Sequence, residues 1–225
     1  MTDEPTGRPA LSSRSDRFSA ALARLPLVAI LRGLRPEEAA AHGAALELAG
    51  FALIEVPLNS PDPFTSIATL RRGCAPATLV GAGTVTRIDE VERLAATGAD
   101  LAVMPHADIT VIRAAKAAGL LCVPGVATPT EAFAALHAGA DALKLFPAEL
   151  VTPAVMKAMR AVLPPALPLL PVGGITPEVL AGWRAAGASG FGLGSALYAP
   201  GRSADDVGQR AAQFVRAWRD CSAPA

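Results

Sequence analysis

The segment Ala142-Leu143-Lys144-Leu145-Phe146-Pro147 places a lysine in the middle of an otherwise apolar run. The run follows Gly139-Ala140-Asp141 and ends at a proline, and these boundaries favour an interior strand of a parallel sheet over a solvated helix. An ammonium group is out of place in such a strand, because burying it without a partner carries a large free-energy cost. In an apolar pocket a lysine is driven toward the neutral amine, which is a nucleophile toward ketones.

A structural alternative for Lys144 is a side chain that reaches solvent at a strand end or pairs with a carboxylate. The lysine alone leaves both interpretations open. The other two lysines of the chain, Lys116 and Lys157, lie in Ala-rich segments of helical pattern, where a solvated helix face accounts for them. This contrast favours a chemical role for Lys144.

Outward from this segment, short apolar runs alternate eight times with longer segments of helical period. We expect strands at 27–32, 53–58, 79–84, 101–105, 120–124, 142–146, 169–173 and 190–194. We expect helices at 36–49, 62–72, 88–97, 108–118, 129–138, 153–162, 177–186 and 204–219. Eight such units in series predict a single-domain (β/α)8 TIM barrel. A doubly wound open sheet is the alternative, but the first crossover lacks Gly-x-Gly-x-x-Gly.

The length and the N-terminal composition predict the domain organisation. A chain of 225 residues suits one large domain. Residues 1–15 lack periodicity and are rich in Pro, Gly, Ser and Arg, so we expect a disordered leader there and the barrel domain at 16–225. No apolar signal segment opens the chain, and four prolines interrupt the uncharged run 161–176, so we expect neither secretion nor a membrane span.

Charge and cysteine content argue against several classes of function. The formal net charge is zero, with 52% hydrophobic and 18% charged residues, which gives no electrostatic reason to expect nucleic acid or an acidic membrane as a partner. Cys74, Cys122 and Cys221 form an odd set without metal-ligand spacing. We therefore expect reduced thiols in a cytoplasmic protein and no metal site.

Polar residues within or just after apolar runs gather at the expected C-terminal ends of the strands, where barrel enzymes hold their active sites. They are Arg32, Glu55, Thr84 and Lys144. A buried structural ion pair is the alternative for Arg32 and Glu55. Three inward charges are harder to explain by structure alone, because packed hydrophobic residues would be at least as stable.

Two glycine-rich segments end the last two expected strands: Val172-Gly173-Gly174-Ile175 and Gly192-Leu193-Gly194-Ser195. Loops at these positions are the usual phosphate cradle of this barrel type, since glycine lets the backbone approach the phosphate oxygens. Either segment alone is a common turn, whereas the pair indicates a phosphate site. A Schiff-base lysine beside a phosphate site predicts a phosphorylated sugar acid or ketose as substrate.

Six motifs, in order along the chain, carry a resemblance to one family. They are AILRG at 29–33, IEVPLNSP at 54–61, GAGTV at 81–85, PGVATPTEA at 124–132, LKLFPAE at 143–149 and VGGITPE at 172–178. From about residue 25 to 218 the chain resembles the 2-keto-3-deoxy-6-phosphogluconate and 2-keto-3-deoxy-6-phosphogalactonate aldolases, which are class I aldolases. Pro-Leu-Asn-Ser at 57–60, and Val172 where gluconate enzymes usually have threonine, resemble the galactonate branch.

The resemblance implies a role for each candidate residue. Lys144 matches the Schiff-base lysine, Glu55 the catalytic carboxylate and Arg32 the ligand of the substrate carboxylate. Positions that match the rest of the substrate site are Thr84, Pro105 and Phe146 at the pyruvyl pocket and Gly173, Gly174, Gly194 and Ser195 at the phosphate, with Val172 beside them. The resemblance further implies a homotrimer without a cofactor. It also implies cleavage of 2-dehydro-3-deoxy-6-phosphogalactonate to pyruvate and glyceraldehyde 3-phosphate, with the gluconate epimer as the alternative substrate.

Two other functions remain alternatives. An isomerase or synthase on a phosphate-binding barrel would keep the glycine loops without needing Lys144, and a phosphosugar sensor would keep the loops while losing the lysine or glutamate. The histidines add little: we expect His42 and His137 to be solvated, and His106 to lie either near the substrate or on the surface.

Overall fold

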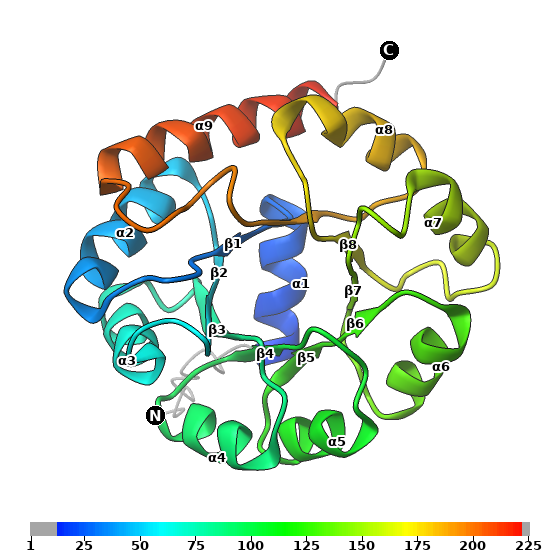
Figure 1. The fold of residues 1–225 in the computed structure, drawn as a ribbon, viewed down its shortest axis with the longest axis horizontal. Coiled ribbons are helices and arrows are strands. Elements are labelled where there is room, and N and C mark those ends of the chain that lie inside the picture. Colours follow the sequence, from blue (N-terminus) through cyan, green and yellow to red (C-terminus); the bar gives the residue numbers. More distant parts are fainter. Residues whose placement is uncertain (1–12, 222–225) are drawn as a thin grey trace, which may run out of the picture.

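Parallel strands form the centre of the fold and helices surround them (Figure 1). The computed structural model describes residues 13–221. The strands are β1 Leu27–Ile30, β2 Leu53–Pro57, β3 Leu79–Gly83, β4 Leu101–Val103, β5 Leu121–Val123, β6 Gly125–Val126, β7 Leu143–Leu145, β8 Leu169–Pro171 and β9 Phe191–Leu193. The helices are α1 Arg14–Arg24, α2 Pro36–Ala49, α3 Pro63–Gly73, α4 Ile88–Ala96, α5 Ile109–Ala117, α6 Pro129–His137, α7 Pro153–Arg160, η1 Pro177–Val179 (a 3-10 helix), α8 Leu180–Ala185 and α9 Ala204–Asp220.

Hydrogen bonds join the strands into two parallel sheets. The larger sheet has the order β5-β4-β3-β2-β1-β9, and the smaller has the order β6-β7-β8. The last strand pairs with the first, with Leu27 opposite Phe191. An isolated parallel bridge between Val172 and Gly192 connects the end of β8 to β9, and a single residue, Pro124, separates β5 from β6. The protein therefore has an α/β fold of parallel strands and covering helices.

All the expected strands and helices are present, although one helix is divided and one further strand is added. The strand expected at 120–124 is β5, which ends before Pro124, a residue with no N–H to donate to a ladder. The added strand, β6, follows this proline, and β5 pairs with β4 while β6 pairs with β7. The helix expected at 177–186 consists of η1 followed by α8. The strands end earlier than predicted, which leaves Arg32, Thr84 and Pro105 in the loops that follow.

Helix α1 is absent from the sequence predictions. Residues 1–12 of the expected leader lie outside the described residues, whereas Arg14 and Ser15 are helical. Ser13 caps the helix, with its Oγ accepting from Asp16 N–H at 3.0 Å and its own N–H donating to the Asp16 carboxylate at 3.1 Å. This capping box, followed by buried Phe18 and Ala21, is the local signal for the helix.

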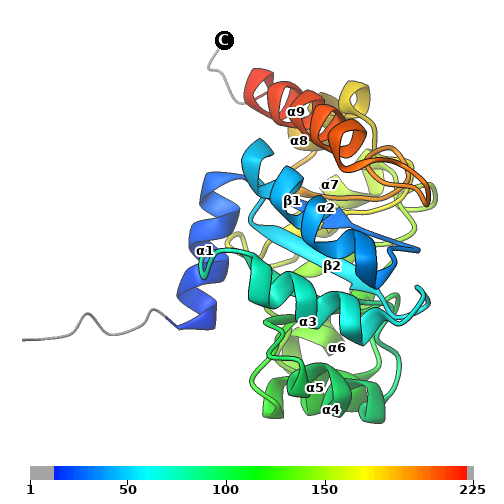
Figure 2. The same ribbon diagram turned by 90° about the vertical axis from the view of Figure 1, so that its left-hand side faces the viewer.

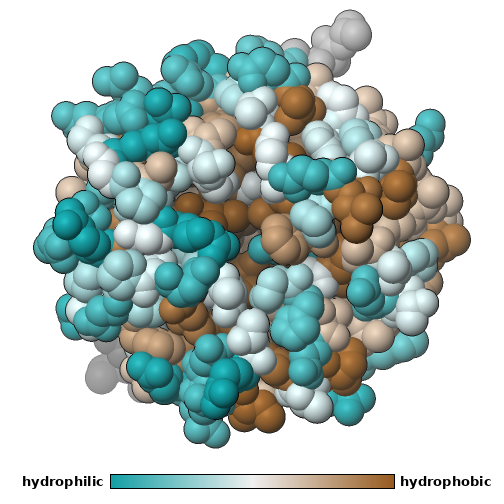
Figure 3. All heavy atoms as spheres, viewed as in Figure 1, coloured by the Kyte–Doolittle hydropathy of each residue, from teal (hydrophilic) through white to brown (hydrophobic). Residues whose placement is uncertain are grey.

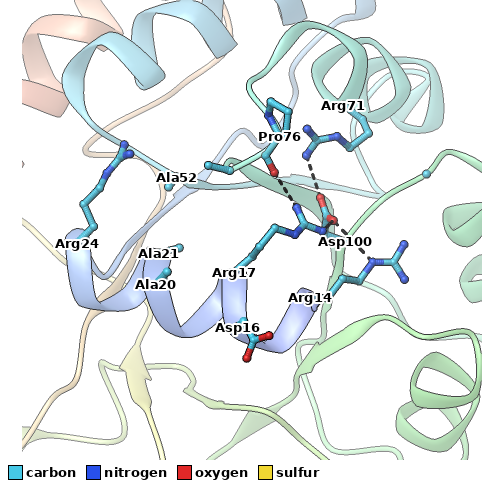
Figure 4. A pocket seen from close by; sticks show the side chains of 12 residues that line it. Arg14, Asp16, Arg17, Ala20, Ala21, Arg24, Ala52, Arg71, Pro76 and Asp100 are labelled. Carbon is cyan, nitrogen blue, oxygen red and sulfur yellow. Dashed lines mark hydrogen bonds and ion pairs between the residues drawn. The ribbon is translucent and has the colours of Figure 1, made fainter. Parts of the chain in front are cut away.

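Helix α1 lies across the N-terminal ends of the strands and is held there by arginines (Figures 2 and 4). Buried Asp100 accepts from Arg17 Nη2 at 2.5 Å and from Arg71 Nη1 at 2.9 Å. Arginine side chains of the helix also donate hydrogen bonds to backbone carbonyls: Arg17 to Pro76, Arg14 to Gly119 and Arg24 to Gly50. An open cavity of about 900 Å³ lies beside these side chains. The hydrogen bonds and ion pair of these guanidinium groups fix α1 in place across the strand ends.

The core consists of two apolar clusters that the strands separate. The larger lies between the strands and the helices and includes Leu27 and Ala29 of β1. The smaller includes Val28 of β1, with Phe18 of α1 packed into it. Alternate residues of a strand point to opposite faces, so this division follows the two-residue period of the sequence. No helix among residues 13–221 is long and apolar enough to cross a membrane.

Candidate active site

The two-residue period of the strands directs Lys144 and Glu55 to the interior face. Leu143 and Leu145 pack toward the helices, so Lys144 between them points inward. Leu53 belongs to the interior cluster, so Glu55, two residues further along the same strand, points to the same face. The two side chains meet in an interior cavity that both of them line.

Lys144 is almost fully buried, with 5% of its surface exposed. Its strand pairs it with Gly125 on one side and Leu170 on the other. The Nζ atom lies 4.4 Å from the centroid of the Phe146 ring. Burial lowers the pKa of Lys144 and nearby Arg32 lowers it further, while Glu55 acts in the opposite direction. The site therefore favours the neutral amine more than water does.

Glu55 is even more buried, with 1% exposed, and its Oε2 atom has no hydrogen-bond partner among the described residues. Burial raises the pKa of Glu55 to about 7, against the opposing effects of Lys144 and Arg32. A carboxyl group with this pKa exchanges its proton near neutral pH, as a general acid or base must. The unpartnered oxygen leaves one acceptor position for a substrate or a water molecule.

Arg32 differs from these two residues, because it lies in the loop after β1 and its side chain is exposed. The expectation of three inward charges is therefore wrong for Arg32. Its Nη1 donates to Asn59 Oδ1 at 2.6 Å, and the next backbone N–H, of Gly33, donates to Ser60 Oγ at 2.9 Å. The loop after β2 thus fixes the loop that carries Arg32. Sequence reasoning gave Asn59 and Ser60 no such role.

A second cavity, of about 380 Å³, opens at the C-terminal ends of the strands. Figure 3 views this end, where hydrophobic side chains are visible at the centre among hydrophilic ones. Eight predicted site residues line the cavity: Arg32, Lys144, Phe146, Val172, Gly173, Gly174, Gly194 and Ser195. Thr84 and Pro105 follow β3 and β4 at the same end, but neither is among the described residues that line it. Thr84 has a φ of 58°, so its backbone departs from the alternation of the strand before it.

Val172 lines both cavities, as do Ile30 and Lys144. Its bridge partner is Gly192, where a Cβ would lie 2.6 Å from Val172 Cγ2. A glycine at 192 therefore makes room for the valine. Val172 thus lines the same cavities as the buried lysine and directly precedes the glycine loop.

The glycine loops have the backbone that their sequences predict. Gly173 and Gly174 have φ values of 118° and 59°, which residues with a Cβ rarely adopt. Gly194 begins a turn in which its carbonyl accepts from Leu197 and Tyr198 N–H at 2.9 Å. Ser195 is exposed, and its carbonyl accepts from Arg202 Nη1 at 2.7 Å. The two loops thus form one wall of the outer cavity.

The histidines differ from one another in burial. His137 is exposed, as expected. The expectation that His42 is solvated is wrong, because only 3% of its surface is exposed. Its ring packs edge-on against Tyr198. Its Nδ1 lies 2.9 Å from the Glu38 carbonyl oxygen and its Nε2 lies 3.0 Å from that of Arg202. His106 is exposed just past β4. Within residues 13–221, no group of three or more His, Cys, Asp or Glu side chains is arranged to hold a metal ion.

The chain is similar to known aldolases over most of its length. Residues 18–209 match the aldolase family described as KDPG and KHG aldolase, so the chain belongs to this aldolase family. Two bacterial relatives carry names of the galactonate branch. The 2-dehydro-3-deoxy-6-phosphogalactonate aldolase of Escherichia coli K12 is 48% identical over 88% of this chain and 96% of its own. A probable enzyme of the same name from Rhizobium meliloti is 51% identical over 86% of this chain and 91% of its own.

A solved structure agrees with this assignment. The structure titled "Native KDPGal structure" superposes with a TM-score of 0.86, at 48% identity, and the match covers 88% of this chain and 97% of that one. The similarity therefore extends over most of both chains.

Proposed function

We propose that this protein is a class I aldolase that cleaves 2-dehydro-3-deoxy-6-phosphogalactonate to pyruvate and glyceraldehyde 3-phosphate. The observation that carries the proposal is the buried pair of Lys144 and Glu55 on one interior face, with the glycine loops beside it. The names of the two bacterial relatives support the galactonate substrate.

The reaction begins at Lys144. Its neutral Nζ attacks the C2 ketone of the substrate and, with loss of water, forms a protonated imine. Arg32 binds the substrate carboxylate through its paired N–H donors, and its bond to Asn59 fixes the direction of the guanidinium group. Thr84, Pro105 and Phe146 line the pyruvyl part of the substrate in this proposal.

Glu55 completes the cleavage. Its carboxylate removes the proton of the C4 hydroxyl, directly or through a water molecule, and the C3–C4 bond breaks. The bonding electrons pass to the imine and form an enamine, while C4 leaves as the aldehyde of glyceraldehyde 3-phosphate. Protonation of the enamine at C3 and hydrolysis of the imine then release pyruvate and restore the lysine.

The remaining candidates bind the phosphate and select the configuration at C4. Backbone groups of Gly173, Gly174, Gly194 and Ser195 hold the phosphate in this proposal. In this proposal Val172 lies between the imine and the phosphate, which is supported by its place in the lining of both cavities and directly before Gly173. It offers no hydrogen bond to a C4 hydroxyl, whereas a threonine of nearly the same shape would.

Turnover of both C4 epimers tests the proposal. We expect wild-type protein to give a higher kcat/KM for the galactonate substrate than for the gluconate epimer. Val172→Thr should shift the ratio toward the gluconate epimer by roughly tenfold, about 1 to 2 kcal/mol for one neutral hydrogen bond. No turnover of either epimer by wild type would contradict the proposed function, and an unchanged ratio in the variant would remove the role of Val172.

We further propose that the two sheets form one closed (β/α)8 TIM barrel within a domain at 16–225. Three observations support closure: the pairing of β9 with β1, the bridge from Val172 to Gly192, and the single residue between β5 and β6. A homotrimer in the cytoplasm, without a cofactor, completes the proposal. Resemblance to the family supports the trimer, and exposed apolar side chains on adjacent α6 and α7, Phe133 and Val155, provide surface for subunit contact.

A further inference from the structure

Glu149 places a carboxylate in the wall of the outer cavity. It follows Ala148, whose N–H donates to the Val172 carbonyl at 2.9 Å, so the turn after β7 is attached to the start of the Val172-Gly173-Gly174 loop. The N–H groups of Leu150 and Val151 both donate to the Pro147 carbonyl, which closes this turn. The turn holds Glu149 directly beside the glycines.

The carboxylate of Glu149 lies against both glycines. A Cβ at Gly173 would be 2.4 Å from Glu149 Oε2, and a Cβ at Gly174 would be 3.4 Å from Glu149 Oε1. The space that glycine leaves open at residue 173 is therefore filled by a carboxylate oxygen. The proposed function places the substrate phosphate at the backbone of these same two glycines.

No cation accounts for the carboxylate at this place. Among residues 13–221, Glu149 forms no ion pair and no side-chain hydrogen bond. The residue is exposed, so a substrate can reach its side chain. Arg32 lines the same cavity, so its positive charge attracts an anion there, whether it is the carboxylate of Glu149 or a phosphate.

We propose that Glu149 is a specificity-determining residue whose carboxylate lies against the glycine loop that binds the phosphate and competes with phosphate for this place. This inference rests on the proposed function. An entering substrate displaces the carboxylate because its own carboxylate and ketone are held at Arg32 and Lys144. A free inorganic phosphate lacks these contacts and is excluded. The same repulsion favours departure of the phosphorylated product.

The size of the effect follows from the charges. Two like charges about 4 Å apart in water repel by about 1 kcal/mol, or about fivefold in affinity, and partial shielding from water increases this. We therefore expect Glu149→Gln to tighten inhibition by inorganic phosphate about five- to thirtyfold and to lower the KM of the phosphorylated substrate in the same direction. Glu149→Ala should act likewise, because it also removes the charge.

The experiment measures the inhibition constant of inorganic phosphate and the KM of phosphorylated and dephosphorylated substrate for wild type, Glu149→Gln and Glu149→Ala. Glu92→Gln is the matched control, because Glu92 is an exposed glutamate on α4, away from the cavity. We expect this control to behave as wild type, and the KM of the dephosphorylated substrate to be the same in all four proteins.

Phosphate inhibition that is unchanged or weaker in Glu149→Gln would overturn the inference, since a carboxylate that helps to bind the substrate would give weaker binding when removed. Tightening in Glu149→Ala alone would also overturn it, because charge would not then be the cause. Both outcomes leave wild-type turnover intact and so differ from failure of the proposed function, in which wild type cleaves neither epimer.

Discussion

Gly83 leaves the space that the Glu55 carboxylate occupies. A Cβ at residue 83 would lie 1.8 Å from Glu55 Oε2 and 2.4 Å from its Cδ. The two residues belong to paired strands, β2 and β3, whose register sets Gly83 opposite Pro57. The buried carboxylate is therefore directed by a glycine on the neighbouring strand as well as by its own backbone.

Replacement of this glycine should impair cleavage. Gly83→Ala forces the Glu55 carboxylate to move, so we expect kcat for cleavage to fall by roughly 10² to 10⁴, the usual contribution of a general acid or base. Borohydride trapping of pyruvate on Lys144 should persist, because the lysine is untouched. Gly182→Ala is the control, since a Cβ there meets nothing within 4 Å. Normal cleavage by Gly83→Ala would show that the position of Glu55 is not limiting.

Glu55 should also make stability depend on pH. Its pKa is raised from 4.5 to about 7 in the folded protein, so the folded state holds a proton that the unfolded chain has already released in this range. The folded state is therefore penalised as pH rises from about 4.5 to 7. Each pKa difference of one corresponds to about 1.4 kcal/mol, so Glu55→Gln should gain about 3 kcal/mol relative to wild type between pH 4 and pH 8.

Urea unfolding of both proteins at the two pH values measures this gain. An equal difference at pH 4 and pH 8 would show that the pKa of Glu55 is not raised. Cleavage by wild type should rise in the same pH range, because the carboxylate form accepts the proton from C4.

Asp100 should carry much of the stability at the opposite end of the strands. Its buried carboxylate accepts from Arg17, Arg71 and the Val80 N–H, and Arg14 lies 3.7 Å away. Asp100→Ala leaves these donors without their acceptor, so we expect a loss of about 3 to 5 kcal/mol in the free energy of unfolding. Asp89→Asn, which removes an exposed partner of Arg87, is the control and should change stability little. Equal effects of the two variants would contradict this role.

The eight strand–helix units were predictable from the sequence, because strands and helices each have their own pattern of apolar residues. Buried parallel strands are short apolar runs, and in the helices between them apolar residues recur every three to four positions. Both patterns can be recognised within a short stretch of sequence. The importance of Lys144 and Glu55 was predictable for a related reason, because a charged residue within an apolar strand is costly to bury and therefore stands out in the sequence.

The remaining features depend on contacts that no local pattern encodes. Helix α1 lies in a segment rich in arginine and serine, so only its cap at Ser13 and a few apolar residues signal it. His42 lies on a helix whose sequence does not reveal that Tyr198 packs against its ring. Asn59 and Glu149 lie in loops, and their positions beside Arg32 and Gly173 follow from tertiary structure alone.

The most direct test of the central claim is trapping with pyruvate and borohydride followed by peptide mapping. We expect irreversible inactivation of wild-type protein with the label on Lys144, and no label on Lys144→Met. Labelling of Lys116 or Lys157, or full activity after treatment, would contradict a Schiff-base mechanism at Lys144.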